Sequence, residues 1–159
     1  MKKIIAAVAI ISMMYLPACK NAEKKDEAAG NKTEKLKTPA DSLMKDVMDG
    51  HDAVMPKMGK LKLAERQAKR MLDSIAALPA KARAEASALK LKLETLINDL
   101  DYADFAMDKW MTEFNMDSAK DNIEQRIKYL AEEKLKVTKV KESILDGLAR
   151  ADSLLKAKR

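Results

Sequence analysis

Residues 82–114 read ARAEASALKLKLETLINDLDYADFAMDKWMTEF, and their apolar side chains recur at helical spacing. Steps of four and three residues alternate along one set of positions: Ala82, Ala86, Leu89, Leu93, Leu96, Leu100, Ala103, Met107, Trp110 and Phe114. A heptad pattern of this length predicts one long helix, over about residues 80–114, that buries a continuous seam against partner helices.

The segment before this helix predicts a first helix over about residues 40–77. Thr38 can cap it, Pro39 suits its first turn, and an apolar face runs along it. Pro56 lies inside the pattern. Because proline lacks a backbone N–H and its ring clashes with the preceding turn, we expect the first helix to be kinked there. Pro79 marks the turn to the second helix.

A third helix is predicted over about residues 118–156. The short polar run Asn115-Met116-Asp117 favours a turn and a new helix cap. The predicted seam of this helix includes two lysines, whose aliphatic stems can cover apolar surface. Its positions are Ile123, Ile127, Leu130, Lys134, Val137, Lys141, Ile144, Leu148, Ala151 and Leu155.

Three long helices joined by tight turns predict an all-α fold, an antiparallel up-down-up three-helix bundle with coiled-coil-like helices over residues 39–157. The composition agrees, since 35% of residues are charged, 4% are aromatic, and only 4 are glycine and 4 proline. One continuous coiled coil that dimerises is the alternative. Pro79 and the break at residues 115–117 favour the monomeric bundle.

Residues 1–18 have the organisation of a bacterial lipoprotein signal peptide. Two lysines precede an apolar run that is too short to span a bilayer, and the run ends in Leu16-Pro17-Ala18-Cys19. This ending resembles the lipobox, where cleavage occurs before the cysteine and the cysteine then carries the lipid. Cys19 is the only cysteine, and lipidation accounts for a lone thiol in an exported chain. The alternative is an ordinary signal peptide followed by an unrelated cysteine.

Residues 19–38 predict a flexible tether, because they are rich in charge and contain one large apolar residue, Leu36. The expected location is the cell envelope, with the membrane bound through Cys19. Lys20 stands where aspartate would favour retention at the inner membrane, so the resemblance implies an outer-membrane lipoprotein that faces the periplasm or the surface. With an export signal and a mild net charge of +6, nucleic acid is not an expected partner.

A stripe of sulfur-containing side chains marks the first predicted helix. Its members are Met44, Met48, His51, Met55 and Met58, separated by four, three, four and three residues. This spacing places all five side chains on one side of a helix. His51 is the only histidine of the chain.

Antiparallel packing predicts which residues lie level with this stripe. Counting equal distances from the turn at Pro79 brings Met107, Trp110 and Met111 to the level of His51. Counting onward to the third helix brings Gln125 to the same level.

The two methionine-rich segments also carry the acidic excess of the chain. Residues 40–58 and 99–124 hold more acidic than basic side chains, whereas residues 59–98 and 125–159 are basic. We therefore expect a bundle whose charge differs between its two halves, with the Met/His stripe in the acidic half.

Thioethers and a neutral imidazole are ligands that suit Cu(I) or Ag(I). The candidate ligands are Met48, His51, Met55, Met58, Met107 and Met111. Asp49 and Asp52 flank His51 and could orient its ring by hydrogen bonds, and Trp110 could lie over a bound cation. Two alternatives stay open: the methionines only fill the core beside aromatic residues, or they line a groove for a peptide or small ligand.

Catalysis is not expected from this sequence. The single cysteine is predicted to be acylated, there is one histidine, and neither a Gly-rich phosphate loop nor a Cys/His zinc motif is present. The carboxylates of Asp101, Asp104 and Asp108 have the spacing of a solvated helix face.

The motif His51-Asp-x-x-Met55-Pro-Lys-Met58, with Trp110-Met111-x-x-Phe114 downstream, resembles a group of small helical lipoproteins of Bacteroidetes. Genomes often label this group viral A-type inclusion proteins. The resemblance covers the lipobox and residues 40–155, and it implies an exported lipoprotein with a helical bundle. The expected function is a non-catalytic, lipid-anchored envelope module for interaction or structure, with an envelope protein as its candidate partner. The alternative is a soft-metal-binding periplasmic lipoprotein.

Overall fold

The computed structural model describes residues 38–156, and 87% of them are helical. No strand occurs in this part of the chain, so the all-α prediction is confirmed. The predicted signal peptide, the acylated Cys19 and nearly all of the predicted tether fall outside the described residues.

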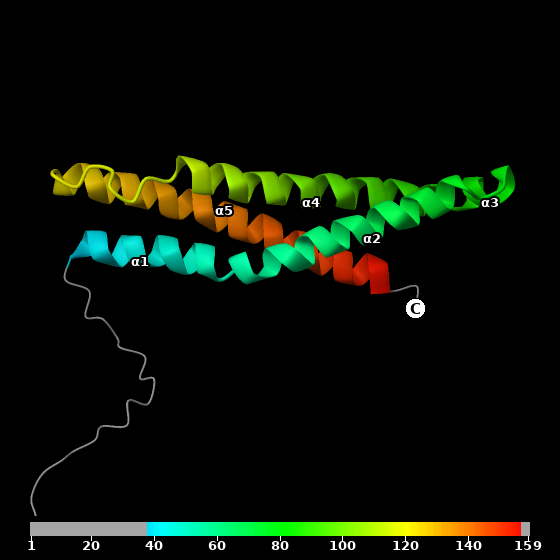
Figure 1. Cartoon of the computed structure of the whole chain (residues 1–159), viewed down its shortest axis with the longest axis horizontal. Helices are drawn as coiled ribbons and strands as arrows, with labels where there is room; N and C mark the ends of the chain where they lie inside the picture. The colour runs from blue at the N-terminus through cyan, green and yellow to red at the C-terminus, as the bar shows by residue number, and fades with distance from the viewer. Residues whose placement is uncertain (1–37, 157–159) are drawn as a thin grey trace, which may run out of the picture. The chain divides into compact units, whose positions relative to one another are not determined.

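Five α-helices and one short 3₁₀ helix follow one another between residues 38 and 156. They are α1 (Pro39–Asp52), η1 (Met55–Lys57), α2 (Met58–Ala76), α3 (Ala80–Glu85), α4 (Ser87–Glu113) and α5 (Ile123–Lys156). Figure 1 shows their arrangement, and the helices α1, α2, α4 and α5 pack against one another.

Thr38 caps α1, as the sequence predicts. The backbone N–H of Asp41 donates to the Thr38 hydroxyl oxygen at 3.1 Å, and Pro39 occupies the first turn. This hydrogen bond satisfies one of the backbone donors that a helix N-terminus leaves unpaired.

Pro56 interrupts the first predicted helix more severely than the expected kink. Helix α1 ends at Asp52, and its last α-helical hydrogen bond is donated by the Ala53 N–H to the Asp49 carbonyl oxygen. Val54 and Lys57 then donate to the carbonyl oxygens three residues earlier, those of His51 and Val54. The single predicted helix over residues 40–77 is therefore two helices, joined by a turn and η1. The cause is the N–H that Pro56 lacks, which leaves no donor for the Asp52 carbonyl.

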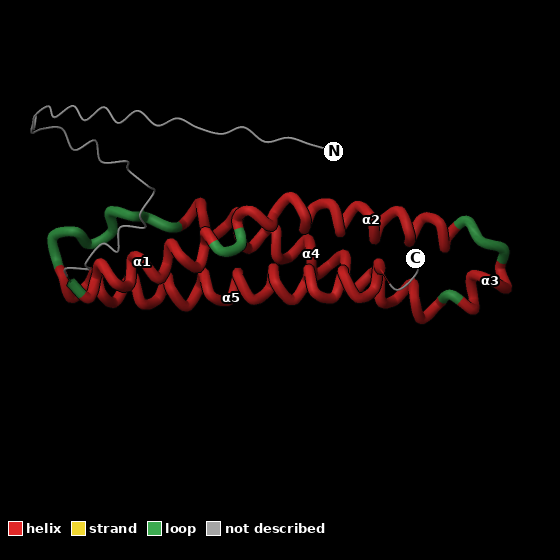
Figure 2. Tube along the Cα trace, turned by 90° about the horizontal axis from the view of Figure 1, so that it is seen from below, coloured by secondary structure: helices red, strands yellow, loops and turns green. Residues whose placement is uncertain are grey.

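The second predicted helix is also divided, although only slightly. A short α3 ends at Glu85, and α4 begins at Ser87 after a tight turn at Ala86. Figure 2 shows this turn and the interruption between α1 and α2 as loop segments between helices.

The third helix begins at Ile123 rather than near Ser118. A nine-residue connection, 114–122, replaces the predicted tight turn. The Asn122 side chain accepts a hydrogen bond from the backbone N–H of Gln125 at 3.1 Å, as a helix cap does. Arg126 holds the connection against α5 by donating to the carbonyl oxygens of Met116 and Ser118.

Ion pairs show that α4 runs antiparallel to α2. Lys62 and Lys69 of α2 lie 3.3 and 3.8 Å from Asp104 and Asp101 of α4, so residue numbers rise along one helix as they fall along the other. Helix α5 is likewise antiparallel to α4, because Arg150 pairs with Asp99 near one end of their contact and Trp110 contacts Glu133 near the other.

Helix α5 runs parallel to α1 and α2, which lie end to end along it (Figure 1). Lys134 pairs with Asp46 of α1 at 2.8 Å, and Asp152 pairs with Lys60 of α2 at 3.0 Å. These four residues therefore set the register of α5 against both α1 and α2.

Asp101 and Asp108 of α4 are exposed, as predicted for a solvated face, whereas Asp104 is half-buried. Burial and the neighbouring Glu65 carboxylate raise the pKa of Asp101, while the hydrogen bond from Lys69 lowers the pKa of Glu65. One carboxylate oxygen of Asp104 is buried, and Lys62 supplies the positive charge beside it. Asp101 and Asp104 thus belong to the polar contact between α2 and α4.

The predicted seam of α4 forms the core. Its central positions are buried, namely Leu93, Leu96, Leu100, Ala103, Met107 and Trp110. The seam predicted for α5 is wrong in part: Ile123 and Lys134 are exposed, and Glu133, Val140 and Gly147 are buried. The inward face of α5 is shifted by about one residue around the helix at these positions.

The predicted level of α5 beside His51 is also wrong. Gly50 lies against Val137, not near Gln125, because the long connection 114–122 lets α5 begin well beyond the end of α4. The register brings Lys134 and Lys136 into the half of the bundle that holds α1. These lysines reduce the acidic excess expected there.

No helix among residues 38–156 combines the length and the apolar character that a membrane crossing requires.

The close approach of α1 to α5 at Gly50 should make that position intolerant of large side chains. A Cβ atom there would lie 3.0 Å from Val137 Cγ1, whereas nothing lies within 4 Å of a Cβ at Gly59. We expect Gly50→Leu to lower the free energy of unfolding by about 1–3 kcal/mol through overpacking. Gly59→Leu, the matched control, should not lower it and should raise it by up to about 1 kcal/mol, because glycine is a poor helix former and this position has room for a side chain. Urea denaturation followed by circular dichroism measures both, and equal effects would contradict this packing.

Candidate functional site

The Met/His stripe straddles the interruption at Pro56. Met44, Met48 and His51 lie half-buried on α1, and Met58 lies half-buried at the start of α2. Met55 is in η1 and is exposed, with 36% of its surface accessible. The change from α-helical to 3₁₀ turns alters the direction of successive side chains, so the stripe is not continuous across residues 53–57.

His51 contacts two of the residues that the sequence places around it. Its Nδ1 atom lies 2.8 Å from Asp52 Oδ1, and its ring centroid lies 5.6 Å from that of Trp110, at an angle of 37°. The contact confirms that α1 and α4 bring His51 and Trp110 to one level. Asp49, the other flanking carboxylate, pairs with Lys45.

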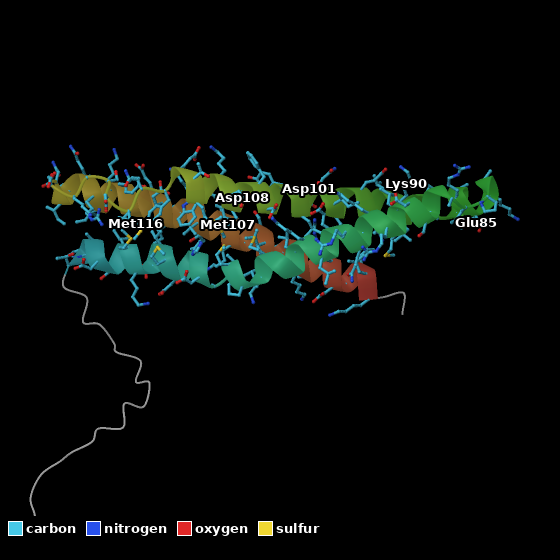
Figure 3. The ribbon with its side chains drawn as sticks, viewed as in Figure 1. Glu85, Lys90, Asp101, Met107, Asp108 and Met116 are labelled. Carbon is cyan, nitrogen blue, oxygen red and sulfur yellow. The ribbon has the colours of Figure 1, made fainter. Side chains whose placement is uncertain are left out.

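The methionines of the second segment differ in burial. Met107 is fully buried in the core, Met111 is 39% exposed at the end of α4, and Met116 lies exposed in the connection (Figure 3). Met107 therefore lies in the core, and Met111 contributes to the surface.

Trp110 stands at the centre of a row of aromatic rings. Its ring stacks on Phe114 with centroids 4.9 Å apart, and Phe114 stacks on Tyr129 of α5 with centroids 6.3 Å apart. With His51 on the other side, this row crosses from α1 through α4 to α5. Stacked rings add packing free energy beyond the area that they bury.

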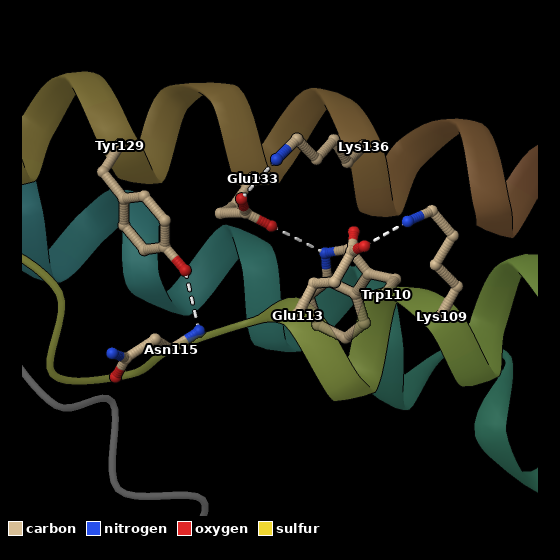
Figure 4. A network of polar contacts seen from close by, with 7 residues as sticks. All are labelled: Lys109, Trp110, Glu113, Asn115, Tyr129, Glu133 and Lys136. Atoms are coloured by element: carbon tan, nitrogen blue, oxygen red, sulfur yellow. Dashed lines mark hydrogen bonds and ion pairs between the residues drawn. The ribbon is translucent and has the colours of Figure 1, made fainter.

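Glu133 is the residue at this site that the sequence analysis missed. Only 3% of it is exposed, and its two carboxylate oxygens accept hydrogen bonds from Trp110 Nε1 at 3.0 Å and from Lys136 Nζ at 2.8 Å (Figure 4). Two signals were available: a buried tryptophan needs an acceptor for its indole N–H, and Leu130, Glu133, Val137 and Val140 have the spacing of a helix face.

Further hydrogen bonds hold the end of α4 and the start of the connection around this pair. Tyr129 accepts a hydrogen bond at its hydroxyl from the backbone N–H of Asn115 at 2.7 Å, and Lys109 pairs with Glu113 (Figure 4). The hydrogen bond to Glu133 raises the pKa of Lys136.

Two surface hollows, also missed by the sequence analysis, are lined by side chains of both α4 and α5. One hollow, of about 380 Å³, is lined by Tyr102, Phe105, Trp110, Lys136, Lys139 and Val140, among others. A second, of about 570 Å³, is lined by Leu91, Lys92, Thr95, Leu96, Arg150 and Leu154, among others. We call the two together the α4/α5 groove.

The groove has large apolar side chains at its edge that no described helix covers. Tyr102 and Phe105 are 63% and 62% exposed, one helical turn apart on α4, and Leu91 is 65% exposed further along it. Contiguous exposed apolar surface beside a hollow is typical of a site for another molecule.

The described residues contain no cluster of three or more His, Cys, Asp or Glu side chains suited to a metal ion. Such a cluster would suit zinc or another borderline or hard cation, whereas thioether ligands are outside this class. The soft-metal prediction on the methionines therefore stays a prediction.

The chain matches no protein-family model, no curated protein and no solved structure.

The Trp110–Glu133 hydrogen bond predicts a strong energetic coupling between α4 and α5. Glu133→Leu should lower the free energy of unfolding by about 1–3 kcal/mol, because the indole N–H is left buried without an acceptor. Trp110→Phe/Glu133→Leu should cost less than the sum of the two single changes, by about 1–3 kcal/mol. Denaturation of the four proteins of this double-mutant cycle gives the coupling, and additive effects would show that the hydrogen bond contributes nothing.

Proposed function

We propose that this protein is a non-catalytic, lipid-anchored module of the cell envelope that binds another envelope protein through its helical surface. The observation that carries the proposal is the exposed aromatic pair, Tyr102 and Phe105, beside a hollow in the α4/α5 groove. Aromatic side chains are enriched at protein–protein interfaces, since they bury a large area and lose few rotamers when they are fixed.

The packing of the helices supports a scaffold that presents this surface. Apolar seams, the buried Trp110–Glu133 hydrogen bond and ion pairs between helices fix α4 against its neighbours. We propose that the three segments 39–76, 80–113 and 123–156 act together as an antiparallel up-down-up three-helix bundle. A bundle of this kind can keep the exposed side chains of α4 in place without the partner.

The proposal places the bundle at the outer membrane, attached through an acylated Cys19 and held away from the lipid by residues 20–37. Its support is the sequence Leu16-Pro17-Ala18-Cys19 and the charged composition of the following residues. On either the periplasmic or the surface side, the bundle would meet proteins that lie near the membrane.

Photo-crosslinking in intact cells tests this function. p-Benzoylphenylalanine is placed in turn at four exposed apolar positions: Leu63 of α2, Leu91 and Phe105 of α4, and Leu145 of α5. We expect at least one of these positions to give an adduct with a single envelope protein, and the mass of this adduct should be the same in repeated experiments. The absence of such an adduct at all four would overturn the proposal.

The matched control tests the lipid anchor in the same cells. Cys19→Ser should remove the acyl mass and release the chain from the membrane fraction, because the lipid supplies the membrane affinity. The adduct should then be lost or strongly reduced, since the bundle is no longer held beside its partner. A Cys19→Ser chain that stays membrane-bound would contradict the anchor.

A soft-metal site at the methionines is the second candidate function, and the geometry of His51 supports it. The 2.8 Å contact of Nδ1 with Asp52 orients the ring, as carboxylates do for ligating histidines, and Trp110 lies beside the ring. Cu(I) or Ag(I) would then be held by His51 with sulfur atoms from Met48, Met55, Met58, Met107 and Met111.

Competition with a chromophoric Cu(I) chelator tests this second candidate. The wild-type chain should withdraw Cu(I) from the chelator, and Met55→Leu/Met58→Leu should weaken the apparent affinity by at least about tenfold, because two soft ligands are lost. Met71→Leu, which alters a half-buried methionine elsewhere on α2, is the control and should match the wild type. Equal, weak competition by all three chains would leave packing as the role of the cluster.

A further inference from the structure

A second heptad pattern runs along α4, on the side that faces away from the core. Its positions also alternate in steps of four and three residues: Leu91, Thr95, Asn98, Tyr102, Phe105 and Lys109. All six are exposed, and three of them are large apolar side chains. A helix with one heptad seam packed in a bundle and another left open has the pattern needed to receive one more helix.

The two hollows of the α4/α5 groove lie along this outer pattern. Leu91 and Thr95 line one hollow, and Tyr102, Phe105 and Lys109 line the other. From Leu91 to Lys109 the pattern extends about 27 Å, at 1.5 Å per helical residue. A partner helix of about five turns would cover this length, with its side chains entering the hollows.

The groove is basic. Lys92, Lys109, Lys136, Lys139 and Arg150 line it, against one acidic side chain, Glu113. Three of these cations are paired with carboxylates, those of Glu113, Glu133 and Asp99. Lys92 and Lys139 form no ion pair with any other residue between 38 and 156, so they are available to an acidic partner.

We propose that the α4/α5 groove binds an amphipathic helix of a partner protein, with apolar residues at heptad spacing and acidic residues along the edge of that stripe. This inference rests on the proposed interaction function and names the surface and the kind of partner. Charge complementarity favours this occupant, because like charges opposite the unpaired lysines would be repelled.

Two other occupants fit the groove less well. A second copy that used the same face would place its lysines against those of the first, and residues 19–37 of this chain have a basic excess and one large apolar side chain. A membrane surface would attract the lysines, but a groove with two hollows is shaped for a rod of side chains rather than for a flat layer.

A designed peptide tests the groove directly. The probe is a fluorescein-labelled helix of three heptads with leucine or isoleucine at positions a and d and glutamate at e and g. We expect the full chain, purified in mild detergent, to bind it at least about tenfold more tightly than the same peptide with lysine at e and g. Fluorescence anisotropy measures both affinities, and equal binding of the two peptides would overturn the proposal.

Surface variants locate the binding. Tyr102→Ser/Phe105→Ser should weaken binding of the glutamate peptide by at least about tenfold, because it removes the exposed apolar anchors. Lys139→Glu should weaken it through charge alone. Leu135→Ser/Leu145→Ser alters two exposed leucines of α5 that do not line the groove, and it should leave binding within about twofold. Loss of binding in this control alone would place the site elsewhere and overturn the proposal.

The adduct formed at the groove identifies the occupant. The full chain with Phe105→p-benzoylphenylalanine is reconstituted in vesicles of phosphatidylethanolamine and phosphatidylglycerol and irradiated with the glutamate peptide. An adduct with the mass of the peptide supports the proposal. If the only adduct joins two copies of the chain, the groove binds a second copy and the proposal is overturned. If the only adduct contains lipid, the groove faces the membrane and the proposal is likewise overturned. If cells give a partner adduct at Leu63 or Leu145 while the peptide fails to bind, the interaction function stands and the groove inference falls.

Discussion

The apolar seam of α4 is the contact on which the other helices depend. Helices α2 and α5 both pack against it, and its central side chains, from Leu93 to Trp110, are buried on that side. Burial of these side chains is the main favourable contribution to folding, since it removes apolar area from water. Ion pairs at the edge of the seam then set direction and register, as Lys62–Asp104 and Arg150–Asp99 do, while contributing little stability at exposed positions.

The site inherits its geometry from this seam. Trp110 is the last fully enclosed large side chain of the seam, and its two polar and aromatic neighbours come from different helices: Glu133 from α5 and His51 from α1. A buried carboxylate is tolerable there because both of its oxygens accept hydrogen bonds. The opposite side of α4 carries the exposed aromatic pair, so one helix both organises the core and presents the surface proposed for binding.

Local sequence rules predicted much of this arrangement, and they failed where distant contacts decide the outcome. The heptad spacing located the core of α4, and equal counting from Pro79 placed Trp110 beside His51, because both depend only on helix geometry. The start of α5 depends instead on how residues 114–122 are held by Arg126 and Tyr129, which no periodicity encodes. Because the start of α5 was predicted too early, the residues of α5 expected beside His51 were wrong, and Glu133 was not predicted to lie beside Trp110. The effect of Pro56 was predicted in position and underestimated in extent, since the loss of one donor was followed by a change to 3₁₀ turns.

The placement of Trp110 also makes the protein its own optical reporter. The chain contains one tryptophan, so its intrinsic tryptophan emission comes from a single indole that touches α1 through His51, the connection 114–122 through Phe114 and α5 through Glu133. Release of α1 would expose that indole to water while most of the helix content remained. The unfolding transition followed by emission wavelength would then no longer coincide with the transition followed by far-ultraviolet circular dichroism. The difference between the two transitions would distinguish undocking of the first helix from unfolding of the whole bundle.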